Sequence, residues 1–206
     1  MDNLGQQKAK KSLAVKKEDL FFEQRKKDVL SKKDKSSVGK LDKRIKGLCT
    51  TINKSIRYYT TSSCSGRVVI MLDKKQKEHG LFLNVYHDKI TLKEIREALK
   101  KISKKRIIKF KQEQPILHVH CKTLEDAQKL LRLAQFSGWK NSGIISSGKR
   151  IILELSGTER LEFFIMNNGF LLVGNDFLEL IIKRCNENLD SGWKKIQKLE
   201  KFCNKL

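Results

Sequence analysis

The sequence predicts a fold of the α+β class, in which a mixed sheet packs against N-terminal helices and one long C-terminal helix. Three observations lead to this prediction. Strand-like and helix-like patterns of apolar residues alternate through the middle of the chain, where two strand–helix–strand units look alike, and a long helical stripe follows them. No GxGxG turn joins a strand to a helix, so a doubly wound, Rossmann-type methyltransferase fold is not supported.

The N-terminal part of the chain is predicted to be basic and helical. Residues 1–17 are rich in lysine and lack periodicity, which predicts a flexible basic arm. One helix is expected over Glu18–Leu30 and a second, after the polar segment SKKDKSSVGKLD, over about Leu41–Asn53. Residues 18–206 are therefore predicted to form a single domain.

Strands and capped helices follow in the middle of the chain. The first three strands are expected at Tyr58–Thr61, Arg67–Leu72 and Leu81–Tyr86. Two similar units come next, and their helices begin at the capping residues Thr91 and Thr123. Their strands, with those that complete the pattern, are expected at Ile107–Phe110, Ile116–Cys121, Ser142–Ile145, Arg150–Leu155 and Leu161–Ile165. The likeness of the units predicts a duplicated strand–helix–strand unit.

The last helix is predicted from its cap and its apolar stripe. Asn175 is the expected N-cap. The stripe comprises Leu178, Ile181, Ile182, Cys185, Leu189, Trp193, Ile196 and Leu199. Helical spacing of this length predicts a helix that packs on the core.

Composition favours a polyanionic partner. Lys plus Arg is 45 against 23 for Asp plus Glu, a net charge of +22, which suits RNA, DNA or an acidic membrane face. A general preference for surface lysine explains part of the excess but not the shortage of acids. No segment reaches the ~18 apolar residues of a membrane span, and no signal peptide is evident. The five cysteines form no CxxC pair, which predicts reduced thiols and a cytoplasmic protein without a zinc finger.

The segment TTSSCSGR, residues 60–67, is the most informative part of the sequence. Hydroxyls, a thiol, a glycine and an arginine lie there between two apolar strands. A loop of small polar residues exposes its backbone N–H groups to a ligand, and Arg67 offers a planar charged group for a phosphate or a carboxylate. The alternative is an ordinary hairpin turn, in which Ser and Gly are common.

Two further clusters have both a functional and a structural interpretation. His118 and His120 alternate onto one strand face, where hydrogen-bonding histidines are favoured over a metal site because no third ligand is evident. Trp139 is either a stacking platform for a base or part of the core. The basic residues near it, Lys140, Lys149 and Arg150, can contact RNA phosphates.

Several of these strings, taken together, resemble a known family. TTSSCSGR, LHVHC with the following LEDAQ helix, and GWKNSGI occur in the order and at the separations of the tRNA wybutosine-synthesising protein 3 family, the methyltransferases of wybutosine synthesis. The segment DKSSVGKLD, with Asp34, Ser36, Gly39 and Asp42, is similar to the family's N-terminal motif, and the Gly148–Arg150 turn also fits. The resemblance runs from about Phe21 to the C-terminus.

The resemblance implies a fold, a methyl donor and an acceptor. The fold would be an α+β arrangement distinct from the usual methyltransferase sheet. The donor would be S-adenosylmethionine, with no metal. The acceptor would be N4 of the tricyclic guanosine-37 derivative in the anticodon stem-loop of phenylalanine tRNA. Two rival functions remain open at this point: a non-catalytic basic RNA-binding protein, and a different enzyme on a similar fold.

On this basis we expect one pocket built from three segments. Ser63 and Ser65 are expected to hydrogen-bond donor or base, Arg67 to hold an anion, and Asp34 or His118 to accept a proton. The expected donor-binding residues are Ser62, Cys64, Ser65, Gly66, Asn141, Ser142 and Gly143. The expected RNA contacts are Trp139, Lys140, Lys149 and Arg150. Methyl transfer depends mainly on positioning, so neither Cys64 nor Cys121 need act as a nucleophile.

Overall fold

The computed structural model describes residues 19–32, 42–74, 80–102 and 106–205. The arm at residues 1–17 and Asp34 therefore lie outside the described residues. The strands of the described part form two sheets of four and five strands, and all their pairings are antiparallel. The α+β class and the absence of a Rossmann-type sheet are confirmed, whereas the single mixed sheet is corrected to two antiparallel sheets.

The two sheets are built from strands that are far apart in the sequence. The first contains, in order, β1 (Tyr58–Cys64), β5 (Ile116–Cys121), β7 (Ile151–Ser156) and β6 (Gly143–Ser147). The second contains, in order, β3 (Phe82–Tyr86), β2 (Arg67–Leu72), β4 (Ile107–Glu113), β8 (Leu161–Asn167) and the short β9 (Phe170–Leu171).

The duplicated unit is present, once in each sheet. Helix α3 (Leu92–Lys100) links β3 to β4, and β2 lies between these two strands. Helix α4 (Leu124–Phe136) links β5 to β6, and β7 lies between these two strands. Thr91 and Thr123 cap the two helices as predicted, each accepting a hydrogen bond from a backbone N–H of the first turn.

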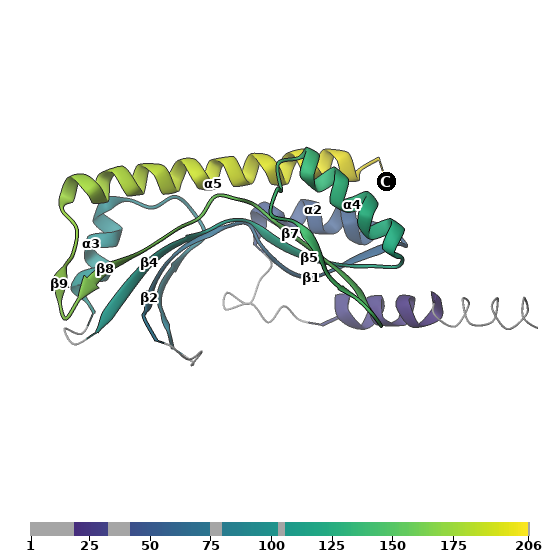
Figure 1. Ribbon diagram of the computed structural model, residues 1–206, viewed down its shortest axis with the longest axis horizontal. Helices are drawn as coiled ribbons and strands as arrows, with labels where there is room; N and C mark the ends of the chain where they lie inside the picture. Colours follow the sequence, from purple (N-terminus) through teal and green to yellow (C-terminus); the bar gives the residue numbers. More distant parts are fainter. Residues whose placement is uncertain (1–18, 33–41, 75–79, 103–105, 206) are drawn as a thin grey trace, which may run out of the picture.

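Three short segments pass from one sheet to the other at the same place. Residues 65–66 join β1 to β2, residues 114–115 join β4 to β5, and residues 157–160 join β7 to β8. Gly66 has φ +99°, a conformation that favours glycine. The sheets follow one another as an arch, with this junction near its middle (Figure 1).

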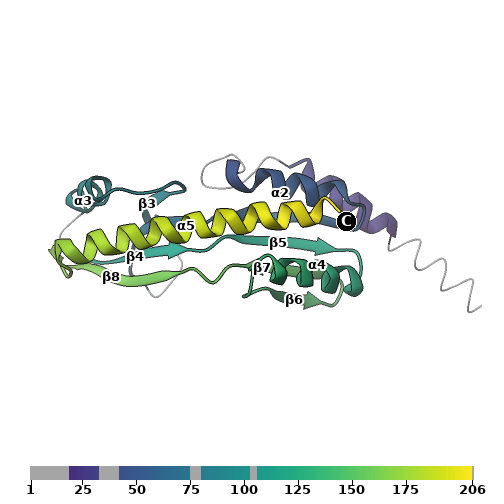
Figure 2. The same ribbon diagram turned by 90° about the horizontal axis from the view of Figure 1, so that it is seen from above.

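Helix α5 (Asn175–Cys203) holds the two sheets together from one side. It runs over both sheets and beside α2 (Lys43–Lys54) (Figure 2). All residues of the predicted apolar stripe except Ile181 are buried, and Gly192 and Cys203 are buried as well. The N-cap of α5 is Gly174. Asn175 instead accepts a hydrogen bond from Arg96, so the predicted cap is corrected. At the junction, a Cβ on Gly192 would lie 2.9 Å from the ring of Pro115.

The opposite, concave side of the arch is covered in part by the helix at residues 19–30, which lies under the first sheet (Figure 1). The ring of Phe22 packs 5.2 Å from Tyr59 and 5.7 Å from His120. No described helix covers the concave face of the second sheet (Figure 1). Within the described residues, no helix has both the length and the apolar character that crossing a membrane requires.

Candidate active site

A pocket lies on the concave side of the junction, where the second sheet meets the first. Its volume is about 360 Å³. The lining residues are Cys64, Arg67, Lys111, Gln112, Glu113, Gln114, Ile116, Arg160, Leu161 and Glu162. Guanidinium groups and carboxylates face the same space, and Arg67 Nε donates to Glu113 Oε2 at 2.6 Å. The pocket can therefore hold a ligand that carries charges of both signs.

The TTSSCSGR segment forms this junction instead of a turn. Strand β1 continues to Cys64 and pairs with β5 through that residue, so the polar loop expected between Thr61 and Arg67 is corrected to Ser65 and Gly66 alone. Because β1 and β2 belong to different sheets, the alternative of a hairpin turn is also wrong. The sequence could not show this, because a short polar break between two strands looks the same in both arrangements.

A chain of three side chains crosses the concave face of the first sheet. Ser62, His118 and Glu154 lie opposite one another on β1, β5 and β7. The Ser62 hydroxyl lies 2.8 Å from His118 Nδ1, and His118 Nε2 lies 2.7 Å from Glu154 Oε2. A carboxylate accepts hydrogen bonds, so it favours the tautomer with the proton on Nε2 and leaves Nδ1 to accept from the serine.

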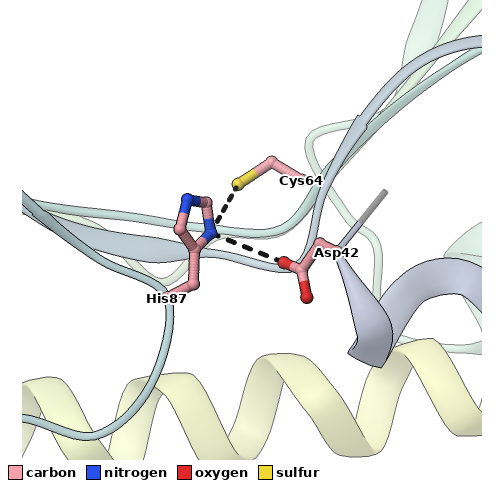
Figure 3. A group of neighbouring side chains, drawn as sticks. All are labelled: Asp42, Cys64 and His87. Atoms are coloured by element: carbon pink, nitrogen blue, oxygen red, sulfur yellow. Dashed lines mark hydrogen bonds and ion pairs between the residues drawn. The ribbon is translucent and has the colours of Figure 1, made fainter. Parts of the chain in front are cut away.

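Asp42 ties helix α2 to the junction, beside Cys64 and His87 (Figure 3). Its Oδ1 accepts from Arg44 N at 3.1 Å as the N-cap of α2. Its Oδ2 accepts from both the backbone N–H and the hydroxyl of Ser65, which is fully buried. Two hydrogen bonds use the lone pairs of Oδ2, so a cation there would have to displace Ser65.

His87 completes this cluster and was not predicted. Its Nδ1 lies 3.5 Å from Asp42 Oδ2 and 3.9 Å from Cys64 Sγ, while its Nε2 is buried with no hydrogen-bond partner among the described residues. A single histidine just after a strand gives no signal in the sequence. Burial raises the pKa of the Cys64 thiol, an effect opposed by the Gly66 N–H and by Arg67. The thiol is therefore a poor nucleophile at neutral pH.

The remaining serines of the segment point away from the pocket. Ser63 lies on the opposite face of β1 from Ser62, where it contacts Cys49 of α2. Ser65 is fully buried and donates to Asp42. Neither hydroxyl therefore faces the pocket, which differs from the expectation that Ser63 and Ser65 contact a ligand. Ser62 is the serine on the concave face.

The second expected ligand segment, residues 141–143, reaches the edge of the junction. Asn141 N donates to the carbonyl of Ser156, and Ser156 N donates to the hydroxyl of Ser142. Gln114, which lines the pocket, donates to the Ser156 hydroxyl at 3.1 Å. These contacts place Asn141–Gly143 behind the pocket wall, where the Ser142 hydroxyl supports the backbone.

Trp139 belongs to the core, which corrects the expectation that it stacks on RNA. Its ring is fully buried, and its Nε1 donates to the carbonyl of Lys195 on α5. Lys140, Lys149 and Arg150 are exposed. Lys140 lies near the Ser156 end of β7 and the other two precede its Ile151 end, about 17 Å apart by the rise of a strand.

Comparison with known proteins decides the family. Residues 24–205 match the family described as "Methyltransferase TYW3". The chain belongs to this family.

Named relatives and solved structures agree with this membership. A protein of Pyrococcus horikoshii named tRNA(Phe) 7-((3-amino-3-carboxypropyl)-4-demethylwyosine(37)-N(4))-methyltransferase 1 is 38% identical over 171 residues, 82% of this chain and 87% of that protein. A Danio rerio tRNA wybutosine-synthesizing protein 3 homolog is 35% identical over 86% of this chain and 72% of its own. The solved structure of the PH1069 protein from Pyrococcus horikoshii has a TM-score of 0.81 at 37% identity, covering 89% and 94% of the two chains.

Proposed function

We propose that this chain transfers a methyl group from S-adenosylmethionine to N4 of the tricyclic guanosine-37 derivative of phenylalanine tRNA. The observation that carries the proposal is membership of the methyltransferase family over residues 24–205, with relatives named for this reaction at 36–38% identity. A cytoplasmic location is compatible with a tRNA substrate and stays a prediction.

The junction pocket supports the choice of donor. S-adenosylmethionine carries a carboxylate, an ammonium and a sulfonium group, so its site needs both cationic and anionic side chains. Arg67 and Arg160 are suited to the carboxylate, and Glu113 and Glu162 to the positive groups. The volume of about 360 Å³ falls within the ~300–1,000 Å³ range of small-molecule sites.

The hydrogen-bonded side chains of Ser62, His118 and Glu154 support the acceptor chemistry. Bound S-adenosylmethionine supplies the electrophilic methyl group. As the nitrogen–carbon bond forms and the sulfur–carbon bond breaks, the proton on N4 must leave. Ser62 can pass that proton to His118 Nδ1 while Glu154 stabilises the charged imidazole. Ser62 lies two residues from Cys64 at the pocket, about 7 Å along β1. Asp34, the other expected proton acceptor, stays a prediction.

The net charge of +22 supports binding of the anticodon stem-loop. Lys140, Lys149 and Arg150 are exposed cations on the first-sheet side of the molecule. Because such contacts release counterions, we expect tRNA affinity to fall steeply as salt rises. The target nucleoside lies in a loop, where a base can be turned out of its stack at modest cost.

A transfer assay tests the proposal. The protein is incubated with S-adenosylmethionine labelled in its methyl group and with phenylalanine tRNA that carries the unmethylated tricyclic intermediate, and unmodified tRNA serves as the control. Label on the first tRNA alone supports the proposal. Salt-sensitive binding of tRNA without any label would support the non-catalytic RNA-binding alternative. Binding of S-adenosylmethionine without transfer to this tRNA would support a different enzyme.

A further inference from the structure

Two phenylalanine rings lie in one row across four strands of the second sheet, on the concave face that no described helix covers (Figure 1). Phe82 on β3 pairs with Met71 on β2, Met71 pairs with Lys109 on β4, and Lys109 pairs with Phe164 on β8. Each ring is 49% exposed. The neighbouring Phe163 faces the other way and stacks on Phe110 in the core at 5.2 Å, so the core does not account for the two exposed rings.

A cation accompanies each ring. The guanidinium carbon of Arg67 lies 5.1 Å from the centre of the Phe82 ring, and Lys109 Nζ lies 5.1 Å from the centre of the Phe164 ring. Both cations are also held by carboxylates, Glu113 and Asp73 respectively. Proteins use exposed aromatic rings with cations beside them to stack unpaired bases and to contact their phosphates.

We propose that Phe82 and Phe164 form a stacking platform for the unpaired nucleotides that flank the modified guanosine in the RNA substrate. The inference rests on the proposed function for its choice of RNA over another ligand. Lys109 leaves the face of Phe164 when a base stacks there and turns to the adjoining phosphate, a movement that its flexible side chain permits. The net charge of +22 favours such a polyanion over an apolar protein segment.

The spacing along the sheet suits this role. The ring of Phe82 lies beside the pocket, because the guanidinium carbon of Arg67, a pocket residue, is 5.1 Å from the centre of that ring. Phe164 lies two residues along β8 from Glu162, which also lines the pocket, about 7 Å by the rise of a strand. The target base can therefore lie at the junction pocket while a neighbouring nucleotide in the loop reaches Phe82 or Phe164.

Binding of an anticodon stem-loop RNA, measured directly by fluorescence anisotropy with the full chain, tests the platform without relying on methyl transfer. Phe82→Ala and Phe164→Ala are each expected to weaken binding about 5- to 150-fold, the equivalent of ~1–3 kcal/mol per stacked base. Phe82→Tyr, which keeps a ring, is expected to bind like the wild type. Phe136→Ala is the matched control, since Phe136 is 76% exposed on α4, outside this face.

Two further readouts separate stacking from other causes. Loss of stacking leaves the slope of log affinity against log salt unchanged. The double variant Lys109→Ala, Lys111→Ala makes that slope less steep by about 1–2. Affinity for S-adenosylmethionine without RNA, measured by calorimetry, is expected to be unchanged in Phe164→Ala, because the ring of Phe164 contacts Lys109 and not Arg67. RNA binding equal to that of Phe136→Ala in both variants would overturn the platform, even if methyl transfer is intact. Weakened binding in both would support it, even if no transfer is found.

Discussion

The hydroxyl of Ser62 lies 2.8 Å from Nδ1 of His118, although 56 positions separate the two residues in the chain. The other ring nitrogen of His118 lies 2.7 Å from Glu154. This relationship gives the concave face a proton acceptor beside the pocket, and its consequences for catalysis can be measured.

Replacing His118 with Gln is expected to lower kcat about 10²- to 10⁴-fold, because N4 of the modified guanosine then has no group to take its proton. Ser62→Ala should give a similar loss, since the proton would no longer reach the imidazole. The measurement is single-turnover methyl transfer to the tRNA intermediate. Ser146→Ala, which removes a hydroxyl from β6 in the same sheet, is the control. Transfer by His118→Gln at the wild-type rate would exclude the relay.

Asp42→Ala is expected to destabilise the protein by about 2–4 kcal/mol. The substitution removes the N-cap of α2, a loss of ~0.5–2 kcal/mol, and leaves buried Ser65 donors without their acceptor, a further ~1–3 kcal/mol. Urea denaturation measures the change. Thr91→Ala, which removes the cap of α3 alone, should cost about 1 kcal/mol. Equal effects would mean that Asp42 does no more than cap its helix.

Gly192→Ala is expected to destabilise the junction by about 1–3 kcal/mol. The new Cβ would lie 2.9 and 3.0 Å from two atoms of the Pro115 ring, which outweighs the ~1 kcal/mol that alanine gains over glycine in a helix. Thermal unfolding reports the loss. At Gly148 no atom lies within 4 Å of an added Cβ, so Gly148→Ala should have little effect. An unchanged melting temperature in Gly192→Ala would show that α5 does not press on the junction.

Stability is expected to fall as the pH decreases from about 6.5 to about 4. Burial, followed by the charges of Arg150 and Arg25, lowers the pKa of His120 to about 4. Between these values the unfolded chain takes up a proton that the folded chain does not, so protonation favours unfolding, by on the order of 1–3 kcal/mol in total.

The check is the free energy of unfolding of the wild type and of His120→Phe between pH 7 and 5. The wild type should show the steeper dependence on pH, since the other histidines are common to both proteins. Equal slopes would mean that His120 titrates alike in the folded and unfolded chains.

Local features of the sequence predict most of the helices and strands. The stripe of α5 and the caps of α3 and α4 depend on residues within one or two turns of each other, so spacing alone reveals them. The strand ends are less accurate, and β1 extends three residues beyond its predicted end. The two-residue β9 was missed because so short a strand has no periodicity.

The site depends on long-range pairing, which spacing does not reveal. Ser62 meets His118 only because β1 pairs with β5, and His87 approaches Asp42 only because β3 lies beside β2. Trp139 shows the same limit. It lies among polar residues in the sequence, and its burial comes from contact with α5, whose residues are about fifty positions away.

The central claim is that the junction pocket serves methyl transfer to tRNA, and one rate comparison tests it most directly. The rate of label transfer from S-adenosylmethionine to the tRNA intermediate is measured for the wild type and for Arg67→Ala, with unfolding curves confirming that both are folded. We predict transfer by the wild type and at least a 100-fold slower rate for Arg67→Ala, because the pocket loses the guanidinium group suited to hold the carboxylate of the donor. Equal rates for the two proteins, or no transfer by the folded wild type, would contradict the account.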